Sequence, residues 1–110
     1  MKYFTPAFFK FFDELANNNN KEWFEKNRNR YENDVKAPFK KLVTDLNEKL
    51  LKDLPDLNRE IHKNIFRINR DIRFSKDKSP YKNNVAAVFS RKGTQDMDYP
   101  GFYLHIRKEI

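Results

Sequence analysis

The sequence predicts an α+β fold, with three N-terminal helices followed by antiparallel β-strands that form an incomplete sheet. Apolar residues recur every three or four positions in the first half, whereas apolar and polar residues alternate in the second half. The 110 residues contain no linker rich in Pro, Gly or Ser. The chain therefore fits one domain over 1–110, or the N-terminal half of a larger α+β domain. We expect the helical part at about 5–54 and the β part at about 64–110.

The first expected helix covers 5–16, where apolar side chains recur at helical spacing. Thr5 is a suitable N-cap, and Pro6 fits the first helical position because its missing amide hydrogen costs nothing there. The apolar face of this helix consists of Phe8, Phe11, Phe12 and Leu15.

A second helix is expected from about 21 to 35, after a polar turn of four asparagines. In that turn Asn19 is followed three residues later by Glu22, which is the pattern of a capping box. Pro38 lacks an amide hydrogen and disfavours helix at the residue before it, so we expect a break there. A third helix then covers about 38–53.

Alternation with period two predicts strands in the second half of the chain. In 66–74 the apolar residues share one parity, and Ile72 and Phe74 are expected in the core. Two further strands are expected within 83–92 and 101–110. A sheet that stops there has an unpaired edge, so we expect it to pack against a missing C-terminal portion or a second copy.

Positive charge is concentrated in one segment. The chain has a net charge of +7, and the 16 residues from 67 to 82 hold six Lys and Arg against two Asp. Compositional bias explains scattered lysines, but it does not explain three arginines, Arg67, Arg70 and Arg73, within seven residues. We therefore expect this segment to carry the functional site.

Several classes of protein are excluded or disfavoured by composition. The chain has no cysteine, which rules out disulfides, thiol catalysis and zinc sites built on Cys. Its only glycines are Gly93 and Gly101, so no P-loop or dinucleotide fingerprint is possible. Charges interrupt the aromatic N-terminus, which is too short and polar for a signal peptide or membrane span. We expect a cytoplasmic protein with no cofactor and no membrane contact.

Two segments resemble the hallmark motifs of the domain of unknown function 2461 family. They are "NNNNKEWFEKNRNRYENDVKAPF" at 17–39 and "FRINRDIRFSKDKSPYKNN" at 66–84, and "YPGFYLHI" at 99–106 is similar to the next segment of the family. The resemblance covers nearly the whole chain and implies a mixed α+β fold. It also implies that this chain is an N-terminal portion, but no established activity comes with it.

The sharpest functional hypothesis is a basic pocket for a ligand that bears a phosphate or a carboxylate. The guanidinium fork binds either group through two hydrogen bonds, and lysines add long-range attraction. The candidate ligand-binding residues are Arg67, Arg70, Arg73, Ser75, Lys76, Lys78 and Lys82. The candidate pocket wall consists of Asp71, Tyr81, Tyr103 and His105.

Three alternative functions remain open. The arginines can pair with acids of their own fold or of an acidic partner, which makes the protein a structural or interaction module. Weak nucleic-acid binding is possible but not favoured, because the excess charge is local and no nucleic-acid motif is present. An enzyme would use the cluster to stabilise negative charge, with His105 or Asp71 moving the proton. No metal site is expected, because Asp71 lies between arginines that compete with a cation.

Overall fold

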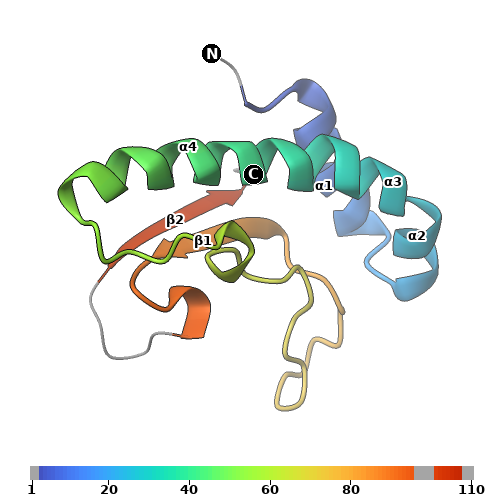
Figure 1. Cartoon of the computed structure of the whole chain (residues 1–110). Helices are drawn as coiled ribbons and strands as arrows, with labels where there is room; N and C mark the ends of the chain where they lie inside the picture. The colour runs from blue at the N-terminus through green and yellow to red at the C-terminus, as the bar shows by residue number, and fades with distance from the viewer. Residues whose placement is uncertain (1–2, 96–100, 108–110) are drawn as a thin grey trace.

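The computed structural model describes residues 3–95 and 101–107. Helices from the first half lie against a two-stranded antiparallel sheet from the second half, as Figure 1 shows. This confirms the predicted α+β class with an incomplete sheet. Within the described part of the chain, no helix is both long and apolar enough to cross a bilayer. The helices are α1 (Pro6–Asn17), α2 (Lys21–Lys26), α3 (Arg28–Arg30), the π-helix η1 (Tyr31–Lys36) and α4 (Ala37–Asp53).

Helix α1 forms as the sequence predicts. Pro6 occupies the first turn, and the four predicted apolar residues of this helix are all buried. An ion pair of 2.7 Å between Glu14 of α1 and Arg30 of α3 connects this helix to the helical segment that follows it. The cap of the second helix differs from expectation. Asn20 is the N-cap, and its side chain accepts a hydrogen bond of 2.8 Å from the amide of Trp23.

The predicted helix break before Pro38 is wrong. Residues 31–36 form a π-helix that leads directly into α4, and Ala37 has helical backbone angles. The amide of Ala37 bonds to the carbonyl of Glu32, five residues back, so the hydrogen-bond register widens just before the proline. Pro38 then lies in the first turn of α4, where a missing amide hydrogen is tolerated. The chain from Lys21 to Asp53 is therefore almost continuously helical.

The core is built mainly from aromatic rings. Phe11 and Phe24 are almost completely buried and lie 6.1 Å apart edge to face. The ring of Tyr81 stacks on Phe24 with centroids 4.0 Å apart, which attaches the second half of the chain to the helices. Such ring pairs add about 0.5–1.5 kcal/mol each beyond the area they bury. The few large side chains of this small domain therefore join its two halves.

The sheet consists of β1 (Asn84–Phe89) and β2 (Phe102–Arg107). Ala87 pairs with Leu104, and Ala86 with His105. The odd-numbered residues of β1 are buried against the helices. The opposite face of the sheet carries Ala86 of β1 together with Tyr103 and His105 of β2. Both strands lie within the segments predicted for them, and 108–110 of the last expected strand lie outside the described residues.

The predicted strand over 66–74 does not form. Residues 65–82 instead make an irregular hairpin, with isolated bridges from Ile65 to Ala87 and from Asn69 to Tyr81. The amide of Phe66 bonds to Ala86, whereas the amide of Lys82 bonds to Ile68. Between these two bonds, residues 83–85 lie opposite Arg67 alone, and this mismatch prevents a regular ladder.

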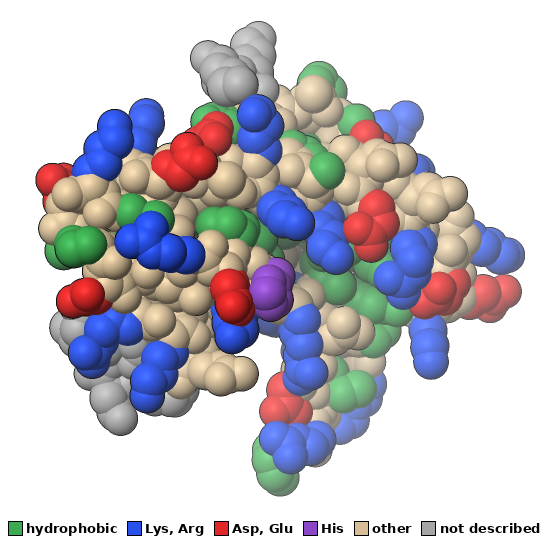
Figure 2. Space-filling model, viewed as in Figure 1, with side chains coloured by type: hydrophobic (Ala, Val, Ile, Leu, Met, Phe, Trp, Pro, Cys, Tyr) green, Lys and Arg blue, Asp and Glu red, His purple; other side chains and the backbone are tan. Residues whose placement is uncertain are grey.

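The hairpin projects from the body of the molecule and carries Lys and Arg side chains along it (Figures 1 and 2). The core positions predicted from its alternating pattern are partly wrong. Ile68 is buried, but Ile72 is only half-buried and Phe74 is 94% exposed at the tip. The alternation ends where the pairing ends, because beyond Arg70 no neighbouring strand fixes which side a residue faces.

Candidate anion-binding site

The arginine cluster divides into three side chains with different surroundings. Arg73 forms a two-bonded pair with Asp71, through contacts of 3.1 and 2.9 Å, at the exposed tip of the hairpin. Hydrogen bonds from Arg73 hold the pKa of the Asp71 carboxyl below its usual range. The Asp71 carboxylate is therefore paired with the Arg73 guanidinium, which makes both groups poorer candidates for binding a ligand or moving a proton.

Arg70 holds the hairpin tip closed. Its guanidinium donates a hydrogen bond of 2.9 Å to the carbonyl of Ser79 and contacts the carboxylate of Asp77 at 3.3 Å. A longer contact of 3.4 Å reaches the hydroxyl of Ser75. The acid that balances Arg70 is thus Asp77, on the opposite arm of the tip.

The other polar residues of the tip mostly bond to one another. Lys78 donates to the carbonyl of Ile72 at 2.7 Å, and Ser79 donates to Asp77 from its amide and its hydroxyl. These bonds lower the pKa of Asp77, with the Ser79 hydroxyl making the largest contribution. Lys76 is exposed and makes no hydrogen bond or ion pair with the described residues. The tip is therefore a self-bonded loop.

Lys82 differs from the other lysines of the predicted site. Its side chain is half-buried, and Nζ lies 5.5 Å from the centre of the Phe66 ring. No hydrogen bond or ion pair joins this amine to any residue that the structure describes. Burial lowers the pKa of the Lys82 ammonium below its ordinary value, and the Arg67 guanidinium lowers it further. A partly desolvated cation thus lies beside another cation.

Lys82 and Arg70 stand between two cavities, each of about 440 Å³. The first, the sheet-face cavity, lies on the face of the sheet that carries Ala86, Tyr103 and His105. It is lined by Phe66, Arg70, Asp71, Lys82, Asn84, Ala86, Tyr103 and His105. The hydroxyl of Tyr103 and Nδ1 of His105 are 3.1 Å apart, which leaves Nε2 of the imidazole for another partner. The hairpin and β2 therefore bring their predicted site residues to one wall.

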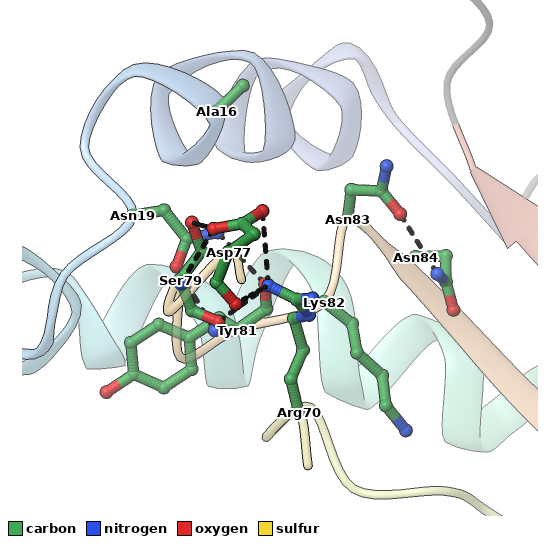
Figure 3. A pocket seen from close by; sticks show the side chains of 9 residues that line it. All are labelled: Ala16, Asn19, Arg70, Asp77, Ser79, Tyr81, Lys82, Asn83 and Asn84. Atoms are coloured by element: carbon green, nitrogen blue, oxygen red, sulfur yellow. Dashed lines mark hydrogen bonds and ion pairs between the residues drawn. The ribbon is translucent and has the colours of Figure 1, made fainter. Parts of the chain in front are cut away.

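The second, the hairpin–helix cavity, lies between the hairpin and the end of α1 (Figure 3). It is lined by Ala16, Asn19, Arg70, Asp77, Ser79, Tyr81, Lys82, Asn83 and Asn84. In Figure 3 the guanidinium of Arg70 reaches into the hydrogen bonds of the tip, whereas the Lys82 amine points away from them. Asn19 fixes the second arm, since its amide group bonds both the amide and the carbonyl of Tyr81 at 3.1 and 2.9 Å.

Arg67 has different surroundings from the other two arginines, although its charge lowers the pKa of Asp71 and of Lys82. It makes no hydrogen bond or ion pair with the described residues and lines a third space, the basic cavity, of about 390 Å³. The lining residues are Arg28, Tyr31, Glu32, Lys36, Lys40, His62, Ile65, Phe66, Arg67, Ile68 and Asn69. Arg67 and Arg73, predicted to grip one anion, thus lie in different places.

The sequence reasoning missed the helical residues of the basic cavity, although a signal for them exists. Arg28, Glu32, Lys36 and Lys40 are spaced by four, which places them along one side of a helix. The expected break before Pro38 divided this row between two helices. Because the helical run is continuous there, the four side chains line up along it.

These surroundings limit the chemistry of the site. Asp71 is paired with Arg73, whereas His105 keeps one ring nitrogen free in the cavity that Lys82 also lines. Within the described residues, no three His, Cys, Asp or Glu side chains gather to hold a metal ion. The arrangement is best suited to holding a negative group.

Comparison with models of protein families gives a match over most of the chain. The model of a family described as "Conserved hypothetical protein (DUF2461)" matches residues 7–110, which confirms the resemblance predicted from the two motifs. No curated protein and no solved structure matches the chain.

Proposed function

We propose that this chain, which belongs to the DUF2461 family of conserved hypothetical proteins, is a binding domain for a small molecule that carries a phosphate or a carboxylate. The anionic group would lie in the sheet-face cavity, between Lys82, Arg70 and the free nitrogen of His105. Phe66 and Tyr103 would border the remainder of the ligand with their rings.

The observation that carries this proposal is the Lys82 ammonium. It is partly removed from water, lies near the Arg67 guanidinium and forms no ion pair with an acid among the described residues. Removing a charge from water without a counter-ion costs free energy, and a bound anion would offset that cost. The lowered pKa reports the same imbalance, since it means that the folded protein holds this proton less tightly than the unfolded chain does.

The structural alternative accounts for two of the three arginines. Arg70 and Arg73 pair with Asp77 and Asp71, and their bonds shape the tip of the hairpin. For Lys82 it offers only the contact with the Phe66 ring, which attracts the ammonium but does not neutralise its charge. We therefore assign Arg73 to the scaffold and Lys82 to the ligand, with Arg70 serving both the hairpin tip and the wall of the cavity. An enzymatic role would need a proton carrier at the cavity, for which His105 is the candidate.

The substitution Lys82→Met tests the proposal. Methionine keeps the length of the side chain and removes the desolvated charge, so the variant should melt at the same temperature as the native protein or higher. The native protein should be stabilised by inorganic phosphate at constant ionic strength, by about 2.7 kcal/mol when phosphate reaches 100 times its Kd. Lys82→Met should lose that stabilisation. Thermal unfolding followed by circular dichroism measures both effects.

Lys76→Met is the matched control for this test. Lys76 is exposed on the tip of the same hairpin and lines neither cavity that Lys82 lines. This variant removes the same charge and should retain the full response to phosphate. If Lys82→Met responds to phosphate as the native protein does, the proposed site is wrong. If Lys82→Met melts several degrees lower, Lys82 belongs to the scaffold instead.

The pH dependence of stability gives the proposal a second check. Because the pKa of Lys82 is lowered on folding, the unfolded chain binds more protons between the folded-state pKa and the ordinary value near 10.4. The contribution of Lys82 to stability therefore rises with pH in that alkaline window. The difference in free energy of unfolding between the native protein and Lys82→Met, measured in urea, should therefore rise with pH in this window, and phosphate should reduce that rise.

A further inference from the structure

The basic cavity is a separate concavity from the one assigned to Lys82. It lies between the helical run and the first arm of the hairpin, and Figure 2 shows Lys and Arg side chains bordering apolar surface below α4 on this face. Four Lys or Arg side chains line it against a single carboxylate, that of Glu32. His62, from the short turn over Ile61–Lys63, completes its rim.

Two of the four cations are already balanced. Arg28 is paired with Glu25 at 2.6 Å, and Lys36 lies 3.7 Å from Glu32. The side chains of Arg67 and Lys40 make no hydrogen bond or ion pair with any described residue. The cavity therefore has two positive charges without a counter-ion among the described residues. One of them is a guanidinium, which binds phosphate oxygens through two parallel hydrogen bonds.

The floor of the basic cavity is apolar. The aromatic side chains of Tyr31 and Phe66 and the aliphatic side chains of Ile65 and Ile68 line it. Burial raises the pKa of Tyr31 to about 12, so its hydroxyl stays protonated at neutral pH. This hydroxyl makes no hydrogen bond with the described residues and is available as a donor. A floor of this kind suits a flat apolar group with a polar end.

We infer that the basic cavity binds an organic phosphomonoester, with the phosphate between Arg67 and Lys40 and a flat apolar group on the floor formed by Tyr31, Phe66, Ile65 and Ile68. A phosphomonoester carries a charge of about −1.5 to −2 at neutral pH, which matches the two positive charges of Arg67 and Lys40. A monocarboxylate would leave one of them unbalanced. This cavity is separate from the one proposed around Lys82, although the Phe66 ring forms part of both walls and the Arg67 charge acts on Lys82.

Calorimetric titration with 1-naphthyl phosphate tests the inference, with 1-naphthol and inorganic phosphate as the two halves of the probe. The native protein should bind 1-naphthyl phosphate at least tenfold more tightly than either half. Arg67→Gln and Lys40→Gln should each weaken its binding about tenfold or more, because each removes a charge-assisted contact. Lys41→Gln, which removes a neighbouring exposed charge of the same helix, should leave the affinity unchanged.

Each other outcome overturns the inference. If Lys41→Gln weakens binding as much as Lys40→Gln, the probe senses only the net charge. If 1-naphthol binds as tightly as 1-naphthyl phosphate, or if inorganic phosphate does so in the Lys82→Met variant that lacks the sheet-face site, the cavity does not recognise both parts. If Lys82→Met abolishes binding and Lys40→Gln does not, the probe occupies the sheet-face cavity, and the function proposed there stands alone. Should Arg67→Gln fail to fold, Lys40→Gln decides the question, since its exposed side chain bonds to no described residue.

Discussion

Phe24→Ala is expected to destabilise the protein by about 3–5 kcal/mol, the usual cost of removing a buried phenyl ring. Phe24 is only 1% exposed and contacts three aromatic residues, of which Phe11 and Tyr31 belong to the helices and Tyr81 to the hairpin. Alanine leaves a cavity at the point where the two halves of the chain meet. Because small domains have a total stability of about 5–15 kcal/mol, this loss is a large fraction of it.

Urea unfolding followed by circular dichroism measures the effect of Phe24→Ala, and the chain offers a matched control. Phe74→Ala makes the same chemical change at a ring that is 94% exposed, so it should alter the free energy of unfolding by less than about 0.5 kcal/mol. Equal losses at the two positions would mean that Phe74 is buried and that the hairpin packs differently. If Phe24→Ala leaves no folded protein, Phe24→Leu gives a smaller cavity and a measurable value.

Gly93→Ala is expected to destabilise the protein by more than the 1–2 kcal/mol that a left-handed backbone costs a residue with a Cβ. Gly93 has φ of +66° at the start of the short turn over Gly93–Gln95. A Cβ built there would collide with the backbone carbonyl of Lys63, and it would lie 3.2 Å from the amide oxygen of Asn64. A backbone group moves less readily than a side chain, so the turn itself must shift.

Gly93→Asn separates the two causes of this effect. Asparagine tolerates left-handed backbone angles better than alanine does, but its Cβ meets the same carbonyl. If the collision dominates, the two variants should lose similar free energies of unfolding. Full recovery in Gly93→Asn would show that backbone strain alone was responsible. Lys92→Ala, at the exposed neighbouring position, is the control and should be close to neutral in the same urea titration.

A buried polar network that the sequence does not reveal lies beside the turn at Gly93. Asn64 and Asn47 are at most 2% exposed, and their side chains bond to each other at 3.3 Å. Asn58 donates to Asn64 at 2.9 Å, and Asn47 donates to the backbone carbonyl of Asn58. Buried amides must be hydrogen-bonded, and these partners lie up to 17 residues apart along the chain. In the sequence the same residues look like part of an Asn-rich background.

The helices could be predicted from the sequence because the information for them is local. Apolar spacing identifies α1 and α4, and the prolines mark their first turns. The error at Pro38 arose because a proline rule describes ordinary α-helix, whereas the chain widens to a π-helix at that point. The strands β1 and β2 were found by alternation, since each has one face against the core.

The candidate site was predictable in its segment but not in its contacts. The concentration of charge in 67–82 singles out the segment that the structure shows as an irregular hairpin. The acids that pair with Arg70 and Arg73 follow from the fold of the tip, which the alternating pattern misrepresented as a strand. Lys82 was one of several equivalent lysines in the sequence. Only its position above the Phe66 ring, beside Arg67 and Arg70, distinguishes it.

The sequence by itself determined the α+β class, the family, the aromatic faces of the helices and the segment that carries the positive charge. Each depends on residue type and short-range spacing. Only the tertiary structure decided which cations have partners, and it separated Arg67 from the two arginines that bind their own acids. The physical reason is that the electrostatic balance of a charge depends on its distance to other charges and to water, and folding sets both distances.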